Sequence, residues 1–281
     1  MIAYNGTVLR VGGSWLTPGD SPSPSVLPAK TMRFQFANTA FDPRDTYASG
    51  TDVPYTWTKV EDGIYDFHCD ADYWTQYGTA ANSNTIFNYM RTAGVQYPFN
   101  QTTLVGDWID VIDSNMTGVI SIPKWMHPFR KTIRYVTLKN TSDMTDGYNW
   151  GNSGGTQLRR ISISDTSHMV DCSSMFRGCF RMEAIPEMDT SSCTSASYMF
   201  NNCSSITSIP LLNTARMTTV SYMFSFCTNV ASGALAMYNQ MSTQTTPPGS
   251  HARCFADCGS STVTGTAELA LIPSSWGGTG A

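Results

Sequence analysis

Apolar residues in the second half of the chain return at fixed intervals. The motif Met-Phe-x-x-Cys occupies residues 175–179, 199–203 and 223–227, and an Ile-Pro pair at 185–186 returns at 209–210. A fixed period of this length predicts stacked repeats, because each unit has an apolar side that it can bury only against its neighbours. The predicted core positions are Met175, Phe176, Cys179, Met199, Phe200, Cys203, Met223, Phe224, Cys227, Phe255 and Cys258.

The repeat extends beyond its three clear copies in weaker form. Residues 136–141 resemble residues 161–166, so the repeat region is predicted to span residues 136–228. After Asn229 the period breaks: residues 233–241 are predicted to form a short helix, and Phe255-x-x-Cys258 is a last, delayed copy. Residues 229–281 are therefore expected to cap the last apolar layer of the stack.

Residues 185–208 illustrate the local structure expected within one unit. Residues 185–188 are predicted to form a short strand. Residues 189–192, Asp-Thr-Ser-Ser, are predicted to form a turn capped by side chains or the start of a helix. Residues 197–200 are predicted to form a helical or 3₁₀ turn that directs Met199 and Phe200 into the core.

Residues 29–135 are predicted to form a β-rich domain. Apolar and polar residues alternate over 32–36 and 55–60, and residues 64–67 form the returning strand after a turn at 61–63. A further strand is expected at 119–122. Residues 85–92 have apolar positions on one helical face and are followed by Gly94, which predicts a short helix there.

Residues 1–28 have a different character from the rest of the chain. Residues 1–16 are predicted to form a hairpin around Asn5-Gly6, and residues 17–28 a semi-stiff linker rich in proline and serine. A lone hairpin is marginally stable in water, so we expect this one to dock onto the body of its own chain, sister subunits or another protein. The alternative is a frayed tail or a leader left from expression. The residues assigned to this anchoring role are Tyr4, Asn5, Gly6, Trp15 and Leu16.

The charge of the chain narrows the classes of function. A net charge of −4, with only 14% charged residues, gives no basic patch that points to nucleic acid. No stretch reaches the roughly 18 apolar residues of a membrane span, so membrane insertion is not expected. The first residues lack the basic start and apolar core of a secretory signal, so the protein is expected to be made in a cytoplasm and not exported by the ordinary route.

The cysteine and histidine positions argue for structure over chemistry. Cysteines at equivalent repeat positions stack on one another, so the eight cysteines are interpreted as structural thiols, with oxidised pairs as the alternative outside the cell. His251, Cys254 and Cys258 supply only three of the four ligands of a structural zinc site. Asp66, Asp70 and Asp72 lack an EF-type loop, so a solvated turn is preferred to a calcium site. No metal or cofactor is expected.

No catalytic residues are predicted. The chain has no Gly-x-Ser-x-Gly elbow and no phosphate-binding glycine loop of the usual forms. Aromatics in Gly- and Thr-rich sequence are a better functional lead, since flat rings beside polar groups bind glycans or protein surfaces. The alternative is that half or more of them belong to the β-rich core. These candidate recognition residues are Tyr47, Tyr55, Trp57, Tyr73, Trp74 and Tyr77.

The repeat resembles the leucine-rich-repeat-like units of the BspA type, whose pattern is Met-Phe-x-x-Cys, an apolar stretch, an Ile-Pro or Leu-Pro pair and then Asp-Thr-Ser. The matching positions here are residues 199–203, 209–210 and 213–214, and the resemblance covers residues 136–230, with the cap to 281. It implies a short solenoid of about 24-residue repeats with a C-terminal cap. Together with the patterns of residues 1–135, this predicts a mainly β fold with short helices: an N-terminal anchor hairpin, a β-rich domain, the solenoid and the cap.

Units of this type are found in adhesins of gut and oral bacteria, in mycoplasma lipoproteins and in structural proteins of phages of gut bacteria. The N-terminal hairpin and spacer resemble the attachment ends of phage fibre or decoration proteins. The resemblance therefore implies a non-enzymatic virion protein, a head or tail fibre or a capsid decoration, made in the host cytoplasm and displayed on the virion surface. Its implied partners are other virion proteins at the N-terminus, a host surface glycan or protein, and further copies in a homotrimer. A bacterial adhesin and a glycan-degrading virion enzyme are the alternatives.

Overall fold

The computed structural model describes residues 26–46, 55–69, 108–121, 132–150 and 157–281, together with strands β1 (Ala3–Tyr4) and β2 (Thr7–Val8). β1 and β2 pair antiparallel, with Tyr4 opposite Thr7. The helix predicted at residues 85–92 lies outside the described residues.

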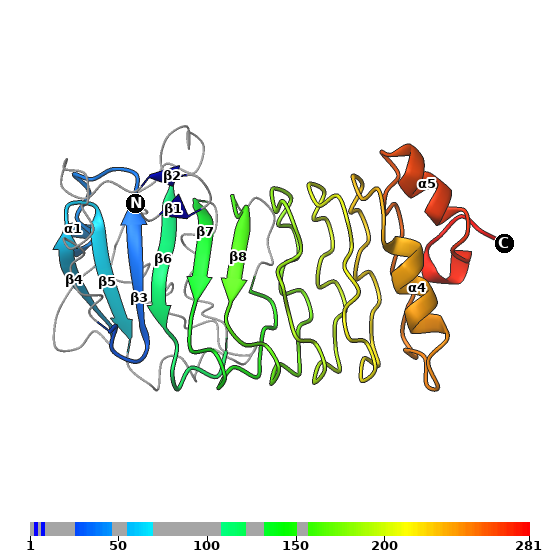
Figure 1. Cartoon of the computed structure of the whole chain (residues 1–281), viewed down its shortest axis with the longest axis horizontal. Helices are drawn as coiled ribbons and strands as arrows, with labels where there is room; N and C mark the ends of the chain where they lie inside the picture. Colours follow the sequence, from blue (N-terminus) through cyan, green and yellow to red (C-terminus); the bar gives the residue numbers. More distant parts are fainter. Residues whose placement is uncertain are drawn as a thin grey trace.

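The fold is mainly β with short helices. The strands of its main sheet are β3 (Thr31–Phe36), β4 (Tyr55–Glu61), β5 (Ile64–Cys69), β6 (Ile109–Asn115), β7 (Ile133–Leu138) and β8 (Arg160–Ile163). They form an open mixed sheet in the order β4-β5-β3-β6-β7-β8 (Figure 1), antiparallel from β4 to β6 and parallel from β6 to β8. The predicted domain boundary at 135/136 falls within β7, so the sheet continues across it.

Alternating side chains of the antiparallel strands form an aromatic core. Phe34 and Phe67 are completely buried, and their ring centroids lie 6.2 Å apart. Trp57 packs against both rings, at 5.3 and 4.7 Å. The strands predicted over 32–36, 55–60 and 64–67 are confirmed as β3, β4 and β5, but the alternation of β4 holds only to Thr58, because Lys59 and Val60 are also exposed. The strand predicted at 119–122 is wrong over its described part, where Ser121 makes a single bridge to Asp146 and residues 119–120 have no strand conformation.

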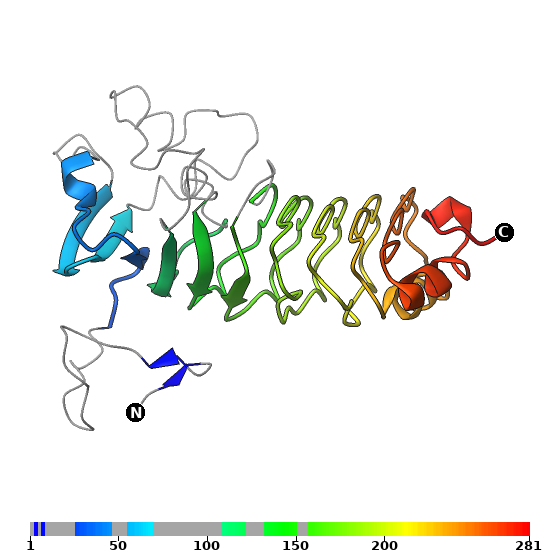
Figure 2. The same ribbon diagram turned by 90° about the horizontal axis from the view of Figure 1, so that it is seen from above.

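From β8 onward the backbone turns in stacked circuits, one for each repeat, and we use "coil" for one such circuit (Figures 1 and 2). Parallel bridges join equivalent positions of successive coils, running from Ser121 through Asp146, Asp171, Ser195 and Thr219 to Ser250. The coils therefore stack in register.

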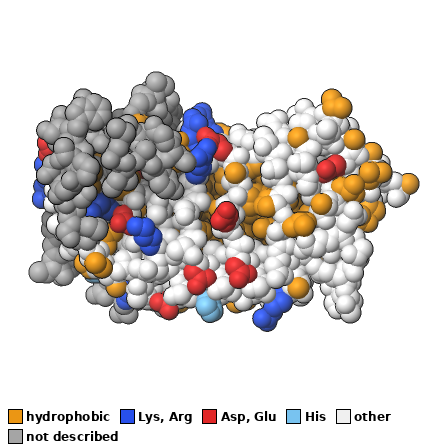
Figure 3. Space-filling view, viewed as in Figure 1, with side chains coloured by type: hydrophobic (Ala, Val, Ile, Leu, Met, Phe, Trp, Pro, Cys, Tyr) orange, Lys and Arg blue, Asp and Glu red, His pale blue; other side chains and the backbone are white. Residues whose placement is uncertain are grey.

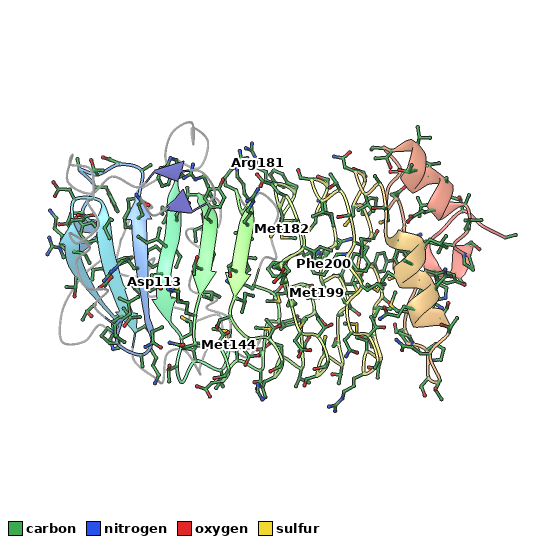
Figure 4. The ribbon with its side chains drawn as sticks, in the orientation of Figure 1. Asp113, Met144, Arg181, Met182, Met199 and Phe200 are labelled. Carbon is green, nitrogen blue, oxygen red and sulfur yellow. The ribbon has the colours of Figure 1, made fainter. Side chains whose placement is uncertain are left out.

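A ladder of phenylalanine rings fills the centre of the stack. Phe176, Phe200, Phe224 and Phe255 are fully buried, and neighbouring ring centroids lie 5.5, 5.6 and 5.7 Å apart with interplanar angles of 6–16°. Met199 is buried beside Phe200 in the same coil (Figure 4). Each ring covers the next, so removing one exposes both neighbours.

The segment that carries the Met-Phe motif is a run of turns rather than the predicted helical or 3₁₀ turn. The amides of Tyr198, Phe200 and Asn202 donate to carbonyls of the next coil at 2.8–2.9 Å, whereas the intervening amides bond within the coil. Tyr198 and Asn202 take left-handed conformations, with φ of 59° and 60°. Such φ values cannot occur within a right-handed helix.

The strand predicted at 185–188 is also wrong. β8 is the last strand of the described sheet, and residues 185–188 have no strand conformation. Pro186 occupies the position equivalent to Ser162 of β8 and has no amide to donate to a parallel neighbour.

Buried threonines link each coil to the next, and the helix after the last full coil replaces the missing link. The hydroxyl of Thr190 donates to the carbonyl of Asn213 at 2.8 Å. At the equivalent Thr214, amide groups of Gln240 and Gln244, from helix α4 (Ala234–Ser242) and the turn that follows it, donate to the hydroxyl instead. The predicted helix at 233–241 is confirmed as α4 and lies against the coil that ends the regular period.

The remaining described helices are α1 (Pro43–Thr46), α5 (Val263–Leu269) and the 3₁₀ helix η2 (Ser274–Trp276). The carboxylate of Glu268 in α5 accepts from the amides of Gly233 and Leu235 at 3.3 and 3.0 Å. It thereby satisfies donors at the start of α4, where the N-cap residue supplies no side-chain hydrogen bond.

We predict that Phe200→Ala lowers the free energy of unfolding by about 3–5 kcal/mol, because it opens a cavity between two stacked rings. Urea unfolding followed by circular dichroism measures the change. Phe226→Ala is the matched control, since Phe226 belongs to the same repeat region but is 47% exposed. We expect Phe226→Ala to cost less than about 1 kcal/mol, and equal losses in the two variants would contradict the ring ladder as the source of stability.

Acid sensitivity should come partly from aspartates that begin the repeat turns. The Ser167 amide and hydroxyl lower the pKa of Asp165, and the Ser191 hydroxyl and amide lower the pKa of Asp189. A carboxyl with a depressed folded-state pKa stabilises the fold above its unfolded pKa of about 4 and loses this effect as the pH falls through the folded value.

The third copy has Asn213, whose side-chain oxygen accepts from the Ala215 amide at 3.1 Å. We therefore expect Asp165→Asn with Asp189→Asn to leave the melting temperature at pH 7 near that of the wild type and to shrink its decline between pH 5 and pH 2. Asp257→Asn is the control and should keep the full decline, because the exposed Asp257 side chain forms no hydrogen bond to the described residues. Identical acid profiles in all three proteins would show that these turns carry no pH dependence.

Candidate functional site

The predicted core residues all lie inside the stack. Every methionine, phenylalanine and cysteine of the predicted set is buried to 0% exposure, from Met175 through Cys258. The thiols of Cys203 and Cys227 donate to the carbonyls of Phe176 and Phe200 in preceding coils, each at 3.1 Å. These side chains therefore hold the coils together and present nothing to a substrate.

All eight cysteines are buried thiols. Burial raises the pKa of Cys227 to about 12 and raises the pKa of Cys203 and Cys258 well above the ordinary range. A thiol must ionise to act as a nucleophile or to bind a metal, so these three cysteines are chemically inert at neutral pH.

His251, one of the three candidate zinc ligands near the C-terminus, packs against other residues. The His251 ring stacks on Trp276 at 4.1 Å, and its Nδ1 lies 2.9 Å from the Pro248 carbonyl oxygen. Within the described ranges, no group of three or more His, Cys, Asp or Glu side chains is placed to hold a metal ion. Asp66 forms an ion pair with Arg33 at 2.7 Å, and Asp70 and Asp72 lie outside the described residues.

Two of the six candidate recognition aromatics prove to be core residues. Tyr55 and Trp57 are only 2% and 6% exposed, because both project from β4 into the aromatic core. Their assignment to recognition is wrong, and the alternation along β4 is the reason. Tyr47, Tyr73, Trp74 and Tyr77 lie outside the described residues, as do Asn5, Gly6, Trp15, Leu16 and the side chain of Tyr4.

The structure presents a different set of surface aromatics on the turn side of the stack. The rings of Tyr198 and Tyr222 stack face to face, with centroids 4.7 Å apart and an interplanar angle of 5°. The guanidinium of Arg177, from the preceding coil, lies over the Tyr198 ring at 4.9 Å, and that of Arg253, from the following coil, lies over Tyr222 at 6.0 Å. We call these four residues the Arg–Tyr row.

Three members of the row, Tyr198, Tyr222 and Arg253, occupy one column of equivalent positions, whereas Arg177 lies three residues after Ser174, the column position of its own coil. Ser174, Tyr198, Tyr222 and Arg253 have φ of 55–59°, and the amides of the first three donate to the coil that follows. A left-handed conformation costs a residue with a side chain about 1–3 kcal/mol, so glycine or asparagine would suit such positions better. Bulky residues at strained positions point to a role other than stability.

Phe226 is a further exposed apolar ring in the coil that carries Tyr222. It lies one turn beyond Tyr222 in the same coil, has a φ of 62°, and is 47% exposed. Asn202 and Asp257 are its equivalents in the neighbouring coils. The sequence does contain a signal for this surface, because Tyr198 and Tyr222 are separated by one repeat period. However, each tyrosine directly precedes the core motif, whose burial already accounts for that period.

The arginines of the row have no acidic partner among the described residues. Elsewhere arginines pair with carboxylates: Arg134 with Asp110 at 2.8 Å and Arg160 with Glu183 at 2.8 Å. Across the described part of the chain, neither Arg177 nor Arg253 forms an ion pair. Their charges therefore remain available to a ligand.

A second exposed surface has an apolar character. Figure 3 shows apolar side chains gathered over the coils between β8 and α4. Leu211 lies in one of these coils and is 65% exposed. Since single exposed apolar residues are common on proteins, the charged row is the more specific of the two features.

Residues 136–247 match a family model described as "Mycoplasma protein of unknown function, DUF285". The matched segment contains β8, the coils up to Cys227 and α4, and it ends before the coil that carries Phe255. The similarity is consistent with the BspA-type resemblance of the repeat and indicates a surface-type protein of unknown function. No curated protein and no solved structure matches the chain.

Helices of membrane-spanning length and apolarity do not occur in the described residues.

We predict that the native protein reacts with less than about one equivalent of a thiol reagent such as DTNB within minutes, and that the eight cysteines all react after unfolding in guanidinium. Absorbance at the wavelength of the released thiolate gives the count. Thr207→Cys, at an exposed position, is the control and should add one fast-reacting thiol. Fast reaction of several native thiols would contradict their burial.

Proposed function

We propose that the protein is a non-enzymatic attachment protein displayed on a biological surface, and that its stacked coils are a BspA-type, leucine-rich-repeat-like solenoid. The observation that carries this proposal is that the inward and outward side chains of the coils have different roles. Thiols, methionines and phenylalanines are used for packing, whereas the outward positions hold an aligned row of tyrosines and of arginines that form no ion pair with the described residues. A stack of this kind builds a continuous surface suited to binding.

The first form of this proposal is a phage virion protein, a head or tail fibre or a capsid decoration. Residues 1–16 anchor the chain to other virion proteins, residues 17–28 act as a spacer, and the stack faces outward. Assembly as a homotrimer rests on analogy with fibres. The sequence resemblance of the N-terminal hairpin and spacer to virion attachment ends supports this form.

The second form is a bacterial cell-surface adhesin. It is supported by the family model, whose description refers to mycoplasma proteins. In both forms the stack contacts a host glycan or protein, so the two differ in what carries the protein. A glycan-degrading virion enzyme is the third candidate, and release of reducing ends from host polysaccharide would distinguish it from pure binding.

We expect gold-labelled antibody raised against residues 157–281 to decorate intact virions of the phage, or intact cells of the bacterium, that encodes this chain. Purified fluorescent protein should also bind intact host cells, and heat-unfolded protein is the control. Label on virions supports the first form, and label on cells supports the adhesin. Antibody that labels neither, together with no binding of the folded protein to cells, would overturn the attachment function.

A further inference from the structure

We propose that the Arg–Tyr row and Phe226 bind an acidic polysaccharide, one whose sugar units carry carboxylate or sulfate groups. This inference rests on the proposed function and specifies its partner. The row is defined by side-chain geometry: Arg177, Tyr198, Tyr222 and Arg253 follow one another along the stack, with two tyrosine rings enclosed between two guanidinium groups.

The arginines select for anions. A guanidinium carries five donors in a planar fork that matches carboxylate or sulfate oxygens. In the described chain neither Arg177 nor Arg253 has an ion-pair partner, and each guanidinium lies over a tyrosine ring, at 4.9 and 6.0 Å from the ring centroid. Asp257, four residues after Arg253, forms no ion pair with it.

The tyrosines favour a hydroxyl-rich partner. Their faces are covered by each other and by the guanidiniums, so the row presents ring edges and phenolic hydroxyls rather than apolar faces. Protein partners usually bury aromatic faces at the centre of an interface, which this packing prevents. Phe226, 47% exposed, leaves an apolar ring that suits the C–H face of one sugar.

The arrangement favours a linear polymer. Equivalent positions of successive coils repeat along a straight axis (Figure 2), with tyrosine centroids 4.7 Å apart. A chain of pyranose rings laid along this axis has a repeat of the same order, so successive sugars meet successive side chains. The net charge of −4 opposes diffuse attraction of a polyanion by the whole molecule, so affinity has to come from the local row.

The test uses the full chain and four probes: alginate oligosaccharides as a polyuronate, heparin oligosaccharides as a polysulfate, dextran as a neutral polymer, and poly-glutamate as an acidic polypeptide. We expect calorimetry to show binding of at least one acidic probe, weakening as salt is raised, and no binding of dextran. Arg177→Gln with Arg253→Gln should weaken binding by at least about tenfold. Lys139→Gln with Arg216→Gln removes the same charge away from the row and should change binding less than about twofold.

Further variants separate charge from geometry. Arg177→Lys with Arg253→Lys keeps the charge but loses the planar fork, and should recover only part of the affinity. Tyr198→Phe with Tyr222→Phe keeps the stacked rings, removes the hydroxyls and should weaken binding while the melting temperature stays close to that of the wild type. Circular dichroism melting establishes that each variant is folded.

Three results would overturn the inference: no binding of either acidic probe, equal weakening in the two double glutamine variants, or tighter binding of poly-glutamate than of the glycans. The last result would assign the row to an acidic protein. Cell binding that persists in the folded Arg177→Gln, Arg253→Gln protein would reject the row but leave the attachment function intact. Loss of alginate or heparin binding in that variant, with no cell binding by wild type, would support the row and reject the attachment function.

Discussion

In-register stacking of the coils is the constraint on which the rest of the structure depends. Amides at every second position of the turn segment donate to carbonyls of the next coil, as from Phe176 to Met199 and from Phe200 to Met223. One residue inserted within the turn segment ahead of the phenylalanine would shift the pairs that follow and move the ring out of the ladder, whereas the extra residues before Arg253 loop out and leave the register intact. The constraint thus fixes backbone pairing and core packing together, and it explains why the Met-Phe-x-x-Cys spacing is held without variation through three coils.

This constraint overrides local preference in the turn segments. Tyr198, Tyr222 and Phe226 all adopt left-handed backbone conformations that glycine or asparagine would adopt at lower cost. Hydrogen bonds to neighbouring coils over-determine the backbone there, so the side chain has little influence on the conformation. Such positions are free to accept any residue that the stack can tolerate, and their side chains can be selected for binding.

The sequence predicts the periodic part of the fold well because periodicity reports burial directly. The core positions, helix α4 and strands β3, β4 and β5 follow from spacing and alternation. The conformation within a coil does not follow, because alternate bonding to two neighbouring coils is a tertiary property. Pro186 argues against a strand in the sequence itself, whereas β6 lacks a clean alternation, since Ile109, Asp110 and Val111 are all buried in a strand that pairs on both sides.

Burial also explains why the prediction of Tyr55 and Trp57 as recognition residues is wrong. Tyr55 and Trp57 stand at alternate positions beside threonines, so their sequence fits both a half-buried strand and an exposed aromatic surface, and their burial decides for the strand. The Arg–Tyr row shows the converse case. Its tyrosines recur with the same period as the buried core residues beside them, so the period alone does not distinguish a surface position from a core position.

A periodic surface favours a periodic partner. At both ends of the row, the regular repeat of tyrosines gives way to an arginine. Arg253 reaches the column of Tyr198 and Tyr222 only because the extra residues before it loop out and the chain then rejoins the register. At the other end, Ser174 holds the column position and is buried, so Arg177 from the same coil reaches across to cover Tyr198. The stack therefore encloses its tyrosine pair between cations from two unrelated sequence positions. Repetition alone would place a third tyrosine or a serine there, so the cations at both ends are features that the repeat does not explain.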